Sequence, residues 1–199
     1  MIIRPLTVFE REAVRDFYVA LEPEDRHKRF CCTISDETIS KYVDRLNFSG
    51  DTVLGAFDEH AQIIGLAELV RGAGAGEMAF SVRADKRGQK IGTRLIQRLM
   101  LRARMCGIRK VFVMFLADNT PMRRMASRAG MVVSSIDGEA HAVRELPSPG
   151  AEELAQWYIE ENLAHSSYFG ALGFARWRAI ANRTTVCAPP ARKLPLPTS

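Results

Sequence analysis

The sequence predicts an α/β domain in which helices flank a mixed, mostly antiparallel sheet. Three strand-like runs follow one another at residues 53–57, 63–70 and 78–83, joined by short polar or glycine-rich turns. This spacing is typical of an antiparallel meander. A near-continuous apolar run at 110–116 predicts a strand that is buried on both faces. Apolar residues at helical spacing between these runs place helices against the sheet.

The N-terminal part predicts one strand followed by two helices. Residues 2–6 form a short apolar strand, and Thr7 and Glu10 have the spacing of a capping box that begins a helix. Pro23 ends that helix. Ser35 caps a second helix, whose first turn is acidic.

The second half predicts two more helices and a hairpin. A long helix covers Gly88–Cys106, and another begins with Thr120 as its cap and Pro121 at its first position. The hairpin covers residues 131–146, and its Asp137-Gly138 pair indicates a type I′ turn. The predicted order is β-α-α-β-β-β-α-β-α-β-β.

We divide the chain at a Pro-Ser-Pro-Gly segment. Residues 1–147 are predicted to form one folded domain, and residues 148–187 a C-terminal helical extension. Residues 188–199 hold four of the nine prolines. We expect this last segment to be a disordered tail.

Composition excludes several protein classes. A chain with 47% hydrophobic and 26% charged residues is not collagen, coiled coil or wholly disordered. It has no apolar run of about 18 residues and no signal-peptide pattern, so we expect a cytoplasmic protein without membrane contact. The four cysteines make no C-x-x-C pair, and the histidines are scattered, so we expect no metal site.

Positive charge is concentrated in one segment. Residues 83–110 contain ten basic residues and one acidic residue, in a chain whose net charge is +5. Such a block favours an anionic small molecule or a nucleic acid as partner. The alternative is a solvated helix face. Few aromatic residues interleave the charges and no nucleic-acid motif is present, so nucleic acid is the weaker of the two partners.

The segment 82–93 joins a strand to a helix through a basic, glycine-containing turn. Free N–H groups at a helix N-terminus bind anions. Gly88 and Gly92 would let a phosphate approach the backbone. The segment therefore predicts a pyrophosphate cradle, although it has neither a Walker A nor a dinucleotide-binding pattern. The basic residues of the turn are Lys86, Arg87 and Lys90.

This turn resembles a known family motif. Arg87-Gly-Gln-Lys-Ile-Gly92 resembles the R/Q-x-x-G-x-G/A motif of the GNAT superfamily of N-acetyltransferases, and residues 117–131 resemble the family's N-x-x-A/M…G-F segment. Residues 21–30 resemble the GNAT domain of bacterial protein-lysine acetyltransferases. The resemblance covers residues 2–146 and implies the GNAT fold, with a seven-stranded sheet whose fourth and fifth strands splay apart.

The resemblance also implies a reaction. The protein would move an acetyl group from acetyl-CoA to a primary amine, on a protein lysine or a small molecule. An amine of pKa about 10.4 is almost entirely protonated at pH 7, so a general base helps. Glu77 stands at the family's base position, with a surface glutamate as the alternative, and Glu68 is the second candidate. The implied coenzyme A contacts are Phe80, Val82, Arg87, Gly88, Gln89, Lys90, Ile91, Gly92, Thr93 and Asn119, of which Asn119 could instead be a turn or cap residue.

Two positions depart from the family pattern. Lys90 replaces a motif glycine, which would limit backbone approach if the position needs positive φ. Ala126 stands where many members carry a tyrosine acid. These departures motivate an alternative function, a non-catalytic acyl-CoA-binding regulatory module. A homodimer through the last strands or the C-terminal helices is a further expectation.

Overall fold

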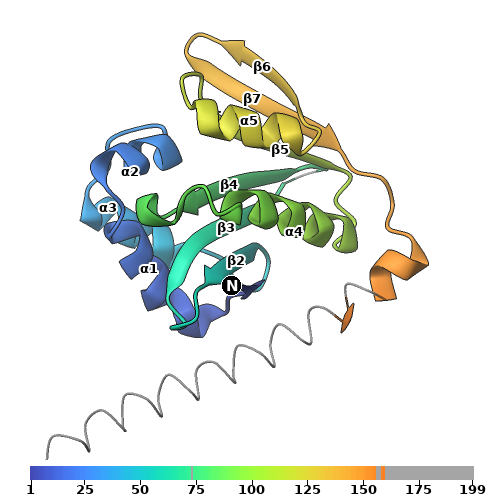
Figure 1. Cartoon of the computed structure of the whole chain (residues 1–199), viewed down its shortest axis with the longest axis horizontal. Coiled ribbons are helices and arrows are strands. Elements are labelled where there is room, and N and C mark those ends of the chain that lie inside the picture. The colour runs from blue at the N-terminus through green and yellow to red at the C-terminus, as the bar shows by residue number, and fades with distance from the viewer. Residues whose placement is uncertain (73, 156–157, 160–199) are drawn as a thin grey trace, which may run out of the picture.

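One seven-stranded sheet runs through the molecule, with helices on both of its faces (Figure 1). The computed structural model describes residues 1–72, 74–155 and 158–159. The strands are β1 (Ile2–Pro5), β2 (Thr52–Phe57), β3 (Ile63–Arg71), β4 (Gly76–Val82), β5 (Lys110–Leu116), β6 (Val132–Ile136) and β7 (Glu139–Glu145). Their order is β1-β2-β3-β4-β5-β7-β6, and every neighbouring pair is antiparallel except β4 and β5. The predicted mixed, mostly antiparallel sheet is confirmed.

The two central strands diverge, as predicted. β3 and β4 pair along the whole of β4, from Gly76 to Val82. β4 and β5 are paired only at Gly76 with Val111 and at Glu77 with Phe112. Beyond this point the edge of β4 that faces β5 has no strand partner among the described residues, so the sheet opens into a V.

The helices divide the core into two parts. They are α1 (Arg11–Val19), α2 (Pro23–Phe30), α3 (Asp36–Asp44), α4 (Ile91–Met105) and α5 (Thr120–Arg128), with short 3-10 turns η1 (Val8–Glu10) and η2 (Ala84–Lys86). Apolar residues of α4 and α5 pack on one face of the sheet. Apolar residues of α1 and α3 pack on the other face. The apolar stripes read from the sequence account for both clusters.

Helix α2 was not predicted. The prediction that Pro23 ends the preceding helix is wrong, because α1 already ends at Val19 and Pro23 occupies the first turn of α2. Proline is favoured there because the N–H that it lacks would have no partner. Glu24 and Asp25 lie in the first turn and Lys28 and Arg29 in the last, which suits the helix dipole. The charge pattern was therefore a usable signal.

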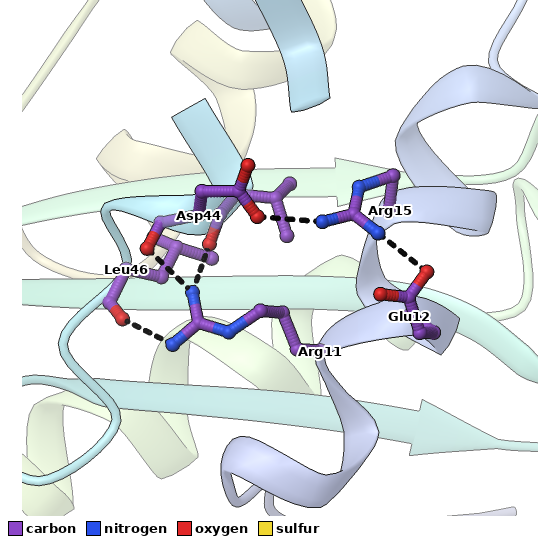
Figure 2. A network of polar contacts seen from close by, with 6 residues as sticks. Arg11, Glu12, Arg15, Asp44 and Leu46 are labelled. Atoms are coloured by element: carbon purple, nitrogen blue, oxygen red, sulfur yellow. Dashed lines mark hydrogen bonds and ion pairs between the residues drawn. The ribbon is translucent and has the colours of Figure 1, made fainter. Parts of the chain in front are cut away.

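An arginine network joins α1 to the end of α3 (Figure 2). Arg11 donates to the carbonyl oxygens of Asp44 at 2.8 Å and Leu46 at 3.2 Å, and also to that of Val43. Carbonyls at a helix C-terminus lack intrahelical partners, so a guanidinium there satisfies them. Arg15 bridges α1 and α3 through Asp44 Oδ1 at 2.6 Å. The network fixes α3 against α1, and α2 lies between these two helices in the sequence.

Two helix starts differ from the sequence predictions, and one predicted turn is confirmed. Helix α4 begins at Ile91 rather than at Gly88, so residues 88–90 belong to the preceding turn. The cap of α5 is Asn119 rather than Thr120, because its side chain accepts from the N–H of Met122. The type I′ hairpin turn at residues 137–138 is confirmed, since both have positive φ.

The described C-terminal segment is helical at residues 151–155 and 158–159. Arg104 of α4 binds it, with bonds of 3.0 Å to the Pro147 carbonyl and 2.6 Å to Glu153 Oε2. The predicted continuation of this extension and the predicted tail at 188–199 lie outside the described residues. Within the described ranges we find no helix with the length and apolarity that crossing a bilayer requires.

Candidate functional site

A cavity of about 530 Å³ lies where α2, β4, the η2 turn, α4 and α5 meet. Nine of the residues predicted to hold coenzyme A line it. They are Phe80, Val82, Arg87, Gly88, Lys90, Ile91, Gly92, Thr93 and Asn119. Gln89, predicted with them, is exposed and does not line it.

The N-terminus of α4 opens into this cavity without a cap. The N-cap residue, Lys90, makes no side-chain cap hydrogen bond, and the described first turn has no acidic residue. The first helical hydrogen bond is donated by Arg94 to the Lys90 carbonyl at 3.0 Å. The N–H groups of Ile91, Gly92 and Thr93 therefore have no intrahelical acceptor. Together with the dipole of a 15-residue helix, they form an anion site.

Backbone donors of β4 also face the opening of the V. Arg83 donates to the Ile64 carbonyl at 3.1 Å. Antiparallel ladders alternate, so Ser81 and Ala79 direct their N–H groups toward β3 as well. Phe80 and Val82 then direct theirs toward β5, which is not paired with β4 there. Two backbone N–H groups thus border the gap between the strands.

The cavity is strongly cationic. Its lining has seven cationic side chains and one carboxylate, that of Asp25, which forms an ion pair with Arg87. Only three of the cations come from the basic block found in the sequence, so seven of its ten basic residues lie outside the cavity, four of them on α4. The others come from α2 and α5 and were missed. The cations are Lys28, Arg29, Lys86, Arg87, Lys90, Arg124 and Arg128.

A second cavity, of about 700 Å³, lies beside α1 and η2. Its charged lining is mainly carboxylate, including Glu10, Asp16, Glu22 and Asp85. An anion would be repelled there. The cationic cavity is therefore the better candidate for the chemistry that the sequence indicates.

Lys90 adopts a left-handed backbone conformation, which is more usual for glycine. Its φ is 60° and its ψ is 16°, in the left-handed region. A residue with a Cβ is strained there by roughly 1 kcal/mol. The side chain is exposed and lines the cavity, so its charge can act on a bound anion. Lysine at this position therefore costs some backbone strain but adds a positive charge to the cavity.

We expect Lys90→Gly to raise the free energy of unfolding by up to about 1 kcal/mol, because the strain is relieved. Lys90→Gln should leave stability unchanged and weaken acetyl-CoA binding by up to about fivefold, the scale of one exposed charge. Urea denaturation and calorimetry measure the two effects. A Lys90→Gly variant less stable than Lys90→Gln would contradict the strain argument.

The two base candidates lie in different surroundings. Glu77 is exposed at the closed end of the V and does not line the cavity. Glu68 lies on β3 and is 2% exposed. Glu68 Oε1 accepts from the Tyr18 hydroxyl, and Oε2 accepts from the Tyr42 hydroxyl and from Arg29 Nη2 at 2.9 Å. Its acceptor sites are thus engaged by donors on three helices.

The donors around Glu68 are held firmly in their protonated forms. Burial raises the pKa of Tyr18, and burial likewise raises the pKa of Tyr42 even though Arg29 opposes it. Burial acts to lower the pKa of Arg29, but the attraction of Tyr18, Glu68 and Tyr42 outweighs it. The Arg29 guanidinium also lies 4.7 Å from the Phe30 ring centroid and 5.5 Å from that of Tyr42. It is therefore fixed by aromatic faces as well as by the carboxylate.

None of the described residues that line the cavity is a tyrosine, histidine or cysteine that could donate a proton. Ala126, at the position of the family's tyrosine, is fully buried in the core. In the part of the chain that the structure describes, no three histidine, cysteine or acidic side chains come together as metal ligands.

Comparison with known proteins identifies the fold. The model of the acetyltransferase (GNAT) family matches residues 11–131, more than half of the chain. The GNAT domain of S. lividans PAT is 24% identical, with a TM-score of 0.63 over 72% of this chain and 89% of that one. A ribosomal-protein-alanine N-acetyltransferase from Brucella melitensis is 18% identical (TM-score 0.59, 73% and 100% covered). A phosphinothricin acetyltransferase from Sinorhizobium meliloti, solved with AcCoA, is 16% identical (TM-score 0.59, 75% and 90% covered).

Proposed function

Because the chain belongs to the acetyltransferase (GNAT) family, we propose that it moves the acetyl group of acetyl-CoA to a primary amine. The observation that carries the proposal is the uncapped N-terminus of α4, which opens into a cationic cavity beside the gap between β4 and β5. The cavity offers phosphate donors, countercharge and a passage toward the sheet. These are the features that an acyl-CoA needs.

Each part of acetyl-CoA has a proposed partner. Ile91, Gly92 and Thr93 would hold the pyrophosphate through their N–H groups. Asn119 uses its oxygen to cap α5, which leaves its amide N–H₂ to donate to the pantetheine arm. The cap and cofactor roles considered for Asn119 are therefore compatible.

Acetyl-CoA supplies a thioester whose carbonyl an amine can attack. The new N–C bond forms, the C–S bond breaks, and coenzyme A leaves as a thiolate while the amine loses a proton. The N–H of Phe80 or Val82 would donate to the carbonyl oxygen as negative charge develops on it. Thiol pKa values lie near 8.5, so the thiolate can leave without a tyrosine acid. The surrounding cations would favour it further.

We propose Glu77 as the base that accepts the amine proton. It lies three residues before Phe80, about 10 Å along the strand, so water would carry the proton. Glu68 suits this role less well because its oxygens are already engaged. It is better placed to position the groups around it.

Glu77→Gln is expected to lower kcat by about 10² to 10⁴-fold, the usual contribution of a general base. The Kd of acetyl-CoA should not change, because Glu77 does not line the cavity. Release of coenzyme A with a panel of amines measures the first quantity, and calorimetry the second. Glu145→Gln, an exposed glutamate at the end of β7, is the matched control. Equal kcat values for the two variants would rule out Glu77 as the base.

The second candidate is a module that binds acyl-CoA without turnover. Ala126 and Lys90 favour it, since both depart from the pattern of catalytic members. Tight acetyl-CoA binding with no release of coenzyme A above the hydrolysis background, for any amine, would support this function over the first.

We further propose a cytoplasmic location. Cys31 and Cys32 are free and exposed, which suits a reducing compartment. Whether the acceptor is a protein lysine or a small amine depends on the wall of the cavity opposite α4.

A further inference from the structure

Two polar groups at the cavity lack hydrogen-bond partners. Ser81 is 9% exposed and lines the cavity, and its Oγ has no partner among the described residues. Arg29, whose side chain is also 9% exposed, lines the same cavity, and its Nε is buried without a partner. Buried polar groups are nearly always paired, so these two groups, which lie beside one cavity, are available to a ligand or water there. Both can donate, and an oxyanion is the ligand that would accept from them.

These groups lie across the sheet from the predicted phosphate cradle. Ser81 is opposite Leu66 in the ladder, and Leu66 packs in the cluster of α1 and α3. Phe80 and Val82 point to the other face, toward α4. The phosphates of acetyl-CoA would bind at α4. A second substrate that reached the thioester from the other face would pass Ser81 and Arg29.

Arg29 is held as a recognition group rather than as a mobile surface charge. Its Nη2 donates to Glu68 Oε2 at 2.9 Å and to the Tyr42 hydroxyl at 2.7 Å. The rings of Tyr18, Phe30 and Tyr42 surround it. A guanidinium fixed in this way loses little entropy when it binds a planar oxyanion.

The charge of the cavity is nearly balanced once coenzyme A is bound. Seven cations and one carboxylate line it. Three of the cations form ion pairs, Arg87 with Asp25, Lys28 with Glu24 and Arg29 with Glu68. Coenzyme A brings about four negative charges, two from its 3′-phosphate and two from its pyrophosphate, and these balance the other four cations. Recognition of a second substrate therefore rests on the two unpaired donors rather than on excess positive charge.

We propose that Arg29 and Ser81 form a subsite for the carboxylate of the acceptor, which is therefore a small amino acid-like amine. This rests on the proposed acetyltransferase function and narrows its substrate class. Glu68 and Tyr42 act as positioning residues, because they orient Arg29. A lysine inside a protein has no carboxylate at the matching distance from its amine and would be a poor acceptor.

The test compares amines that differ only in a carboxylate, such as phenylalanine with phenethylamine and lysine with cadaverine, and adds an end-blocked peptide with an internal lysine. Release of coenzyme A gives kcat/KM for each. We expect the wild-type protein to prefer the carboxylate-bearing member by at least about tenfold. Ser81→Ala and Arg29→Lys should each reduce this preference at least about threefold, mainly through KM. Ser49→Ala, in an exposed turn, is the control and should keep the wild-type preference.

Calorimetry with acetyl-CoA alone separates the possible failures. Unchanged Kd values in Ser81→Ala and Arg29→Lys are expected. A large loss of acetyl-CoA affinity in both would mean that the pair binds the coenzyme's own phosphate, and it would overturn the inference. Equal use of both members of each pair, or preference for the blocked peptide, would also overturn it while leaving the proposed function intact. Binding of acetyl-CoA without transfer to any amine would instead refute the proposed function, and the inference with it.

Discussion

Gly92→Glu is expected to weaken acetyl-CoA binding by at least about 100-fold, which corresponds to about 2.7 kcal/mol. Gly92 is the second residue of α4, where its N–H has no intrahelical acceptor. A carboxylate there would lie within several ångströms of a doubly charged pyrophosphate. Even with an effective dielectric constant of about 20, such a repulsion amounts to several kcal/mol.

Charge rather than bulk should dominate this effect. A Cβ at Gly92 would lie 2.9 Å from the Sδ of Met125, an atom near the end of a flexible side chain that can move. Gly92→Ala should therefore weaken binding much less than Gly92→Glu. Gln97→Glu adds the same charge to an exposed position of the same helix and should bind almost as the wild type does.

Misfolding would not explain the loss. A glutamate in the first turn of a helix interacts favourably with the dipole, and replacing a helical glycine lowers the entropy of the unfolded chain. The variant should thus unfold at the wild-type temperature or above. Calorimetric titration together with a thermal melt measures both quantities. Binding within about threefold of wild type in a folded Gly92→Glu protein would exclude the α4 N-terminus as the phosphate site.

The cradle could be predicted from sequence because its parts are local. A strand, a glycine-containing basic turn and an amphipathic helix occupy residues 78–105, and their order alone creates a helix N-terminus next to a strand end. Gln89 is the exception, since only the turn geometry decides which side chains face outward. The sequence does not predict the left-handed conformation of Lys90; it indicates only that a lysine there would limit backbone approach if the position needs positive φ.

The opposite wall of the site could not be predicted in the same way. Glu68 is joined to Tyr18, Arg29 and Tyr42 across 50, 39 and 26 residues of sequence. No local pattern indicates such contacts, because they depend on how three helices pack on the sheet. A glutamate in an apolar strand looks like a base or a surface residue until its partners are known. Helix α2, which carries Arg29, is not predicted either, because Pro23 at its start is typical of a helix end as well as of a first turn.

This buried cluster gives the second large prediction. Glu68→Ala is expected to lower the free energy of unfolding by about 3–5 kcal/mol, because it leaves Arg29 buried with an uncompensated charge. The side chain of Arg29 is only 9% exposed, so water cannot replace the lost carboxylate readily. Two tyrosine hydroxyls would lose their acceptor as well.

A matched glutamate on the next strand gives the control. Glu77→Ala removes a carboxylate that is exposed, so its effect on stability should stay within about 0.5 kcal/mol. The double variant Glu68→Leu, Arg29→Met tests the mechanism, since it removes both charges at once. It should be more stable than Glu68→Ala, because well-packed apolar groups often replace a buried ion pair without loss.

Chemical denaturation of the wild type, Glu68→Ala, Glu77→Ala and the double variant measures these free energies of unfolding. A loss below about 1 kcal/mol in Glu68→Ala would mean that the cluster contributes little to folding. A double variant as unstable as the single one would mean that packing, rather than buried charge, sets the cost. If both expectations hold, Glu68 is a structural carboxylate whose oxygens are committed to positioning Arg29. The amine proton must then leave by another route, for which Glu77 is the proposed acceptor.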